Sequence, residues 1–92
     1  LSFAGISETE NSTEFVVMPN PSSGNITVSF SYSQQDLIVI SIFDMTGKKQ
    51  TEITTENNTQ SVSCNNLSKG IYLIETKNSR TGERSRKRFI RL

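Results

Sequence analysis

The stretch Leu-Ile-Val-Ile-Ser-Ile-Phe-Asp, residues 37–44, is the longest apolar run in the 92-residue chain and decides its fold class. It is far shorter than the roughly 18 residues that a membrane span needs. Its β-branched and aromatic content is typical of a strand. Side chains of a strand alternate between two faces, and both faces are apolar here. The run therefore predicts a central strand, covered on both faces, at the heart of the core.

Six more strand-like runs surround this one, separated by turn residues at intervals of about ten residues. The seven runs are residues 14–18, 25–31, 37–44, 48–55, 59–65, 71–77 and 84–92. Residues 25–31 alternate between apolar and polar, which indicates one buried face, and the polar run 48–55 is expected at a sheet edge. No stretch has a sustained helical period. We therefore expect an all-β antiparallel sandwich of about seven strands, with under about a tenth of the residues in helix.

Turn residues separate the runs most clearly at residues 19–24, 44–47 and 78–82. In the second of these turns, Asp44 is expected to accept local backbone hydrogen bonds and Gly47 to supply a left-handed conformation. We expect Leu67 to fill the core from a loop. Cys64 shares a predicted face with Val62, so its thiol is expected to be buried and inert.

The composition disfavours catalysis. There is no His, one Cys, and no group of Asp, Glu and Cys with metal-ligand spacing. Most acid–base, zinc and Cys–His chemistry is therefore excluded, and a lone thiol excludes an internal disulfide. A domain of this size also has little room for a deep pocket beside its core. We expect a protein that is not an enzyme and that uses no cofactor or metal.

The chain divides into a polar, acidic segment at residues 1–13, expected to be a flexible linker, and one folded domain at residues 14–92. It begins with Leu1 and carries no signal-peptide pattern. We therefore expect it to be a piece of a longer protein.

Charge is unevenly distributed. Residues 1–44 hold five acids and no Lys or Arg, whereas the residues from Arg80 onward hold six bases and one acid, a net charge of about +5. Nucleic acid is a poor partner because the acidic half would repel phosphate and Phe89 is the tail's single aromatic residue. Two interpretations of the basic last strand stay open: charges that prevent edge-to-edge aggregation, or a surface that a receptor reads.

Four blocks together resemble a known family. They are Pro19-Asn20-Pro21-x-x-Gly24, Phe43-Asp44-x-x-Gly47-Lys48, Leu67-Ser68-Lys69-Gly70-Ile71-Tyr72-Leu73-Ile74 and a terminal basic-apolar strand. From about Phe15 to Leu92, their order and spacing resemble the type A C-terminal sorting domain of the type IX (Por) secretion system. The chain departs from the family in having Phe43 where Tyr is frequent. It also ends Lys87-Arg88-Phe89-Ile90-Arg91-Leu92 where Lys-Lys and aliphatic residues are commoner.

This resemblance implies an immunoglobulin-like sandwich that directs an N-terminally fused cargo across the outer membrane. It further implies removal by a sortase-like peptidase and attachment of the cargo to the cell surface. The implied partners are the translocon, shuttle and sortase components, and the implied location is the periplasm in transit, then the cell surface or the extracellular space. The residues expected to carry recognition are Gly70, Tyr72, Lys87, Arg88, Phe89, Ile90, Arg91 and Leu92.

Two alternatives remain. One is an extracellular adhesive or carbohydrate-binding sandwich, which exposed coplanar aromatics would favour, although the chain has no Trp and predicted strands separate Tyr32 from Tyr72. The other is an uncleaved domain of a component of the secretion machinery. Besides the implied secretion partners, a second copy of the chain is an expected partner, in a dimer formed by strand exchange.

Overall fold

The computed structural model describes residues 15–20, 23–30 and 36–92, and within them the chain is all-β. The expected linker, residues 1–13, lies outside the described residues. The strands are β2 (Phe15–Met18), β3 (Ile26–Phe30), β4 (Ile38–Asp44), β5 (Lys49–Thr55), β6 (Thr59–Val62), β7 (Gly70–Asn78) and β8 (Arg84–Arg91). The described part of the chain contains no helix that could cross a membrane.

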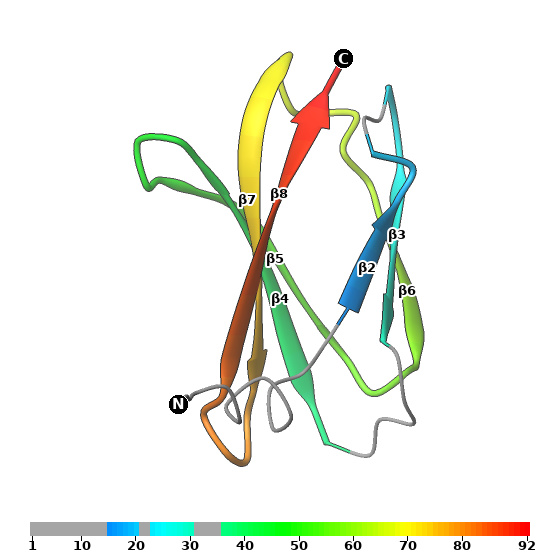
Figure 1. Ribbon diagram of the computed structural model, residues 1–92, viewed down its shortest axis with the longest axis vertical. Coiled ribbons are helices and arrows are strands. Elements are labelled where there is room, and N and C mark those ends of the chain that lie inside the picture. The colour runs from blue at the N-terminus through cyan, green and yellow to red at the C-terminus, as the bar shows by residue number, and fades with distance from the viewer. Residues whose placement is uncertain (1–14, 21–22, 31–35) are drawn as a thin grey trace, which may run out of the picture.

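The strands form two sheets, one in the order β2-β3-β6 and one in the order β5-β4-β7-β8, and all neighbours are antiparallel. Figure 1 shows the two sheets face to face, with the blue strand β2 and the red strand β8 bordering the same side of the sandwich. The strand order is immunoglobulin-like, with β4, β7 and β8 in one sheet and β2, β3 and β6 in the other. The predicted sandwich is confirmed, and so is the edge position of β5.

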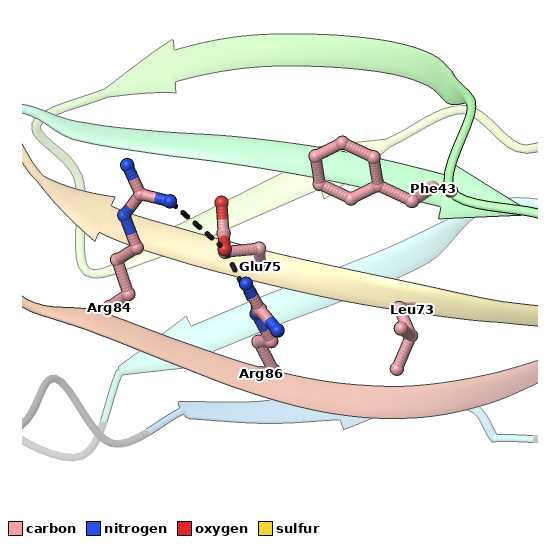
Figure 2. A pocket seen from close by; sticks show the side chains of 6 residues that line it. Phe43, Leu73, Glu75, Arg84 and Arg86 are labelled. Atoms are coloured by element: carbon pink, nitrogen blue, oxygen red, sulfur yellow. Dashed lines mark hydrogen bonds and ion pairs between the residues drawn. The ribbon is translucent and has the colours of Figure 1, made fainter. Parts of the chain in front are cut away.

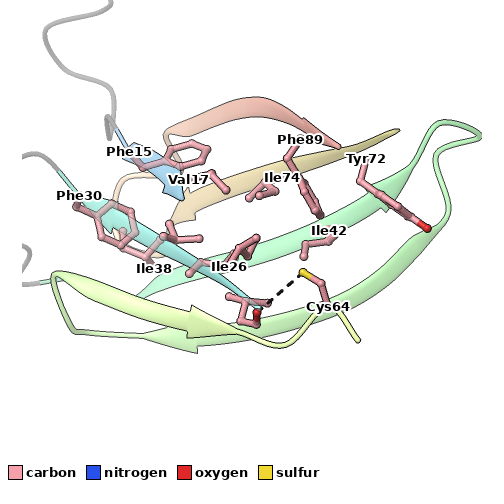
Figure 3. Close-up of a cluster of buried hydrophobic side chains, with 13 residues drawn as sticks. Phe15, Val17, Ile26, Phe30, Ile38, Ile42, Cys64, Tyr72, Ile74 and Phe89 are labelled. Atoms are coloured by element: carbon pink, nitrogen blue, oxygen red, sulfur yellow. Dashed lines mark hydrogen bonds between the residues drawn. The ribbon is translucent and has the colours of Figure 1, made fainter. Parts of the chain in front are cut away.

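The core lies between the sheets and takes apolar side chains from both of them (Figure 3). Cys64 is fully buried there, and Leu67 packs against the core from its loop, as predicted. Burial raises the pKa of the Cys64 thiol, against a smaller opposing effect of the nearby Arg91 charge. The predicted strand 59–65 is too long: β6 ends at Val62, and a turn follows in which Leu67 N–H donates to the Cys64 carbonyl at 3.0 Å.

The two faces of β4 differ. Ile38, Ile40 and Ile42 face the opposite sheet and are fully buried, whereas Leu37, just before the strand, is 44% exposed. On the outer face Val39 and Phe43 are only half-buried, because the described part of the chain places no further layer over this side of the sheet. The prediction that both faces of this run are covered is therefore wrong for the outer face.

Side-chain hydrogen bonds close the two hairpins. Asp44 Oδ1 accepts from Thr46 N–H at 2.9 Å and from Lys48 N–H at 3.0 Å, and Gly47 has a φ of 91°. This hairpin confirms the predicted turn, since a positive φ favours glycine. Between β7 and β8, Asn78 Oδ1 accepts from the backbone N–H groups of Arg80 and Thr81.

Candidate recognition surface

Strand β8 forms one edge of the four-stranded sheet, with β7 on its inner side. Asn78 N–H donates to the Glu83 carbonyl at 2.8 Å, and the register pairs Tyr72 with Phe89. Backbone groups of a strand point alternately to its two sides, so the odd-numbered residues of β8 face β7. The backbone N–H and C=O groups of Arg84, Arg86, Arg88 and Ile90 therefore point away from the sheet.

The side chains of β8 alternate with the same period. Phe89 is fully buried between the sheets, and on the same side of the strand the Lys87 ammonium lies 5.8 Å from the centre of the Phe15 ring. The side chains of the even-numbered residues, Arg84, Arg86, Arg88 and Ile90, lie on the outer face and are exposed. Lys87 and Arg88, neighbours in the sequence, thus present their charges on opposite sides of the strand.

The turn after β2 reaches the open edge of β8. Asn20 Nδ2 donates to the Arg88 carbonyl at 3.3 Å, and Ile90 N–H donates to Asn20 Oδ1 at 3.1 Å. One side-chain amide thus occupies two adjacent positions where a further strand would form hydrogen bonds. These bonds join the edges of the two sheets across about 70 residues of sequence.

A buried carboxylate holds part of the basic strand. Glu75 lies on the outer face of β7, yet only 8% of it is exposed. Its Oε2 atom accepts from Arg86 Nε at 3.0 Å and forms an ion pair with Arg84 Nη1 at 3.7 Å. A shallow cavity of about 260 Å³ lies beside this cluster, with Phe43 and Leu73 on its apolar side (Figure 2). Within the described residues, the structure gives Arg88 no such acidic partner.

The structure divides the predicted recognition residues into two groups. Tyr72 and Phe89 belong to the core: their stacked rings have centres 5.6 Å apart, and the Tyr72 hydroxyl donates to the Ser68 carbonyl at 2.7 Å. Arg91 is half-buried, and its Nε donates to the Cys64 carbonyl at 2.9 Å. In the folded domain, these three side chains stabilise the strand rather than present a free surface.

The remaining predicted residues are accessible. Lys87 and Arg88 are exposed, as are Ile90 and Leu92, with exposed fractions of 42% and 56% for the last two. Gly70, which is half-buried, has a φ of 152°, a conformation that favours glycine, and open space where a Cβ would lie. The backbone conformation therefore accounts for a glycine at this position. A partner that approaches the backbone closely is not needed to explain it.

Sequence reasoning missed the contributions of Asn20, Glu75, Arg84 and Arg86 to this surface. The predicted hairpin between runs 71–77 and 84–92 contains a signal for three of them, because its register places Glu75 directly opposite Arg86, and Arg84 lies two residues from Arg86 on the same face. No comparable signal exists for Asn20, whose position between two prolines is typical of a turn. Its contact with β8 follows from the packing of the two sheets.

The groups that the described residues place on this surface are ones that can bind another protein segment. The described ranges contain no group of three or more His, Cys, Asp and Glu side chains that could hold a metal ion. What they present is a row of guanidinium groups, an open strand edge and a few exposed apolar side chains. Such a surface suits a charged or extended protein segment.

Comparison with known proteins adds two findings. The family described as "Secretion system C-terminal sorting domain" matches residues 16–91. Among solved structures, PorZ of Porphyromonas gingivalis, an essential bacterial surface component of the type IX secretion system, resembles this fold with a TM-score of 0.70 at 17% identity. That similarity covers 94% of this chain and 12% of PorZ, so the chain spans about an eighth of that protein's length. No curated protein matches the chain.

Proposed function

Because the chain belongs to the secretion system C-terminal sorting domain family, we propose that it is a non-enzymatic export signal read through the exposed surface of β8. Membership of this family supports a role in type IX secretion. The observation that supports the location of the signal is the orientation of β8, which presents the Arg88 and Ile90 side chains and its backbone edge to solvent. In this proposal, Tyr72 and Phe89 act from the core by holding the strand in place.

The proposal extends to the steps around recognition. The domain crosses the periplasm attached to an N-terminal cargo, and the translocon, shuttle and sortase components bind it in turn. A sortase-like peptidase then cuts within or before residues 1–13, and the cargo remains at the cell surface or is released outside. The polar composition of residues 1–13 supports a cleavage position there, because peptidases act on segments without a packed core.

The direct test is a reporter protein fused to the N-terminus of this chain and expressed in a bacterium with a type IX secretion system. We expect the reporter outside the outer membrane, and in the periplasm when the chain is omitted. The same fusion in cells that lack the translocon controls for leakage and should stay inside. Retention of the fusion in translocon-positive cells would overturn the proposal, provided that the domain is folded there.

A second measurement determines whether the fused domain is folded. Resistance of the fused domain to protease reports whether it is folded, because digestion requires local or global opening of the chain. N-terminal sequencing of any released domain then locates the cleaved bond. A start well inside residues 25–92 would contradict the proposed position of processing.

A further inference from the structure

Among the described residues, no strand pairs with the outer edge of β8. The backbone N–H and C=O groups of Arg84 and Arg86 point away from β7, and the N–H of Arg88 does the same. This follows because the backbone groups of a strand point alternately to its two sides. Among the described residues, the bonds of Asn20 to the Arg88 carbonyl and the Ile90 N–H are the ones that occupy this edge. Residues 84–88, a continuous segment of about five residues, therefore have outward backbone groups that no described residue other than Asn20 engages.

We propose that a component of the export machinery adds an acidic, extended segment to this edge as a further strand of the four-stranded sheet. This inference rests on the proposed function and specifies how the signal is read. Addition of a strand to a sheet edge is an established mode of peptide recognition, in which main-chain hydrogen bonds supply affinity and side chains supply specificity. The proposed segment lies beside Arg84, Arg86 and Arg88. It ends at the position where the Asn20 side chain bonds to the Arg88 carbonyl and the Ile90 N–H.

The spacing of the arginines fits this mode. Arg84, Arg86 and Arg88 are two residues apart and lie on one face, so their Cα atoms are about 7 Å apart along the strand. Side chains of an added strand repeat with the same period on that face. Acidic side chains at alternate positions would each lie next to one arginine. Arg88 is the best placed of the three, because Glu75 already engages Arg84 and Arg86.

Charge disfavours a second copy of this chain as the occupant. In a β8–β8 pair, two strands with five basic residues out of eight would face each other, and like charges directly opposite destabilise a sheet. The other long edge, β5, carries an ion pair between Lys49 and Glu52 and no comparable excess of one sign. An acidic segment of another protein satisfies both the open backbone groups and the charge of β8.

The test separates the backbone of Arg86 from its side chain. Arg86→Pro and Arg86→Ala both remove the guanidinium, but the proline also removes the outward N–H and places a ring on the open edge. Proline is tolerated at such a position because this N–H does not bond to β7. In the reporter fusion, we expect export of Arg86→Pro to fall at least about tenfold below that of Arg86→Ala, the effect of about 1.4 kcal/mol in binding.

The thermal melt of each variant shows whether a loss of export reflects a loss of folding. If Arg86→Pro is unfolded, Arg84→Pro and Arg84→Ala form an equivalent pair, because proline is well tolerated at the start of a strand. Export of the proline variant at the level of its alanine partner would overturn the inference and leave the proposed function intact. Failure of the wild-type fusion to be exported would instead overturn the proposed function, and the inference with it.

A separate pair of variants tests whether the partner segment is acidic. Arg88→Ala removes a charge, whereas Arg88→Glu places a carboxylate beside the acidic side chains of the added strand. We expect export of Arg88→Glu to be several-fold lower than that of Arg88→Ala, since like charges repel across strands. Equal export of the two variants would exclude an acidic segment as the partner.

Discussion

At the scale of single residues, the position of a side chain on one face of a strand decides its role. Ile40 and Val39 are neighbours in β4, yet Ile40 is fully buried between the sheets and Val39 is half-buried on the outer face. The same alternation separates Phe89 in the core from Arg88 on the surface. A residue's type alone therefore does not tell whether it serves stability or recognition.

This contrast gives the first prediction. Ile40→Ala should lower the free energy of unfolding by about 2–5 kcal/mol, because the substitution removes buried apolar surface and leaves a cavity. Val39→Ala is the matched control and should cost clearly less, since this side chain is already partly exposed to water. Urea denaturation of both variants measures the two values. A loss below about 1 kcal/mol at Ile40 would show that β4 is not central to the core.

Asn20 provides the second prediction. Asn20→Ala removes both hydrogen bonds to β8 and should lower the free energy of unfolding by about 1–2 kcal/mol. Asn20→Asp keeps an acceptor for Ile90 N–H but cannot donate to the Arg88 carbonyl. Hydrogen exchange of the Ile90 amide should therefore be fastest in Asn20→Ala. An Ile90 amide protected equally in wild type and Asn20→Ala would contradict the assigned contact.

At the scale of elements, a carboxylate accepts hydrogen bonds from residues of each hairpin of the four-stranded sheet. The Thr46 hydroxyl, followed by the Lys48 backbone, lowers the pKa of Asp44 below its ordinary value of 3.8. Arg80 is the main cause of the lowered pKa of Asp36, with Nε and Nη2 donating to the carboxylate at 2.9 and 3.0 Å, and Asn78 adds a further bond. The Asp36 bonds connect the β7–β8 hairpin to the residues just before β4.

The third prediction follows from these two pKa values. A carboxyl group whose pKa is lower in the folded state stabilises the protein above its unfolded pKa, and this contribution disappears as the pH falls through the folded pKa. Stability should therefore decline on acidification below about pH 4. Asp36→Asn and Asp44→Asn should each flatten this decline, as chemical denaturation at a series of pH values would show. A decline that is unchanged in both variants would exclude these carboxylates as its cause.

The elements also show what the sequence can predict. The alternation of residues 25–31 and the polar character of residues 48–55 suffice to predict a strand with one buried face and an edge strand, because each depends on its own residues. The exposure of the outer face of β4 could not be predicted, since an apolar run does not tell whether a second layer covers it. The contact of Asn20 with β8 is equally invisible, because it arises from the packing of two sheets.

At the scale of the whole molecule, the side chains that fill the core differ from those that carry charge on the surface of the last strand. Its interior is filled by apolar side chains from both sheets, whereas the charges of the last strand lie outside it. The Lys87 ammonium lies over the Phe15 ring, 5.8 Å from its centre, and Arg88 has no ion pair with the described residues. Exposed charges of this kind contribute little to stability. We therefore expect folding and export to depend on different side chains.

The variant that replaces both Lys87 and Arg88 with alanine tests this claim most directly. Its free energy of unfolding should differ from that of the wild type by no more than about 1 kcal/mol. Fused to a reporter, the wild-type chain should carry the reporter to the cell exterior, and the double variant should leave it in the periplasm. Normal export of the double variant with an unchanged melt would contradict the account and reduce the basic strand to a protection against aggregation.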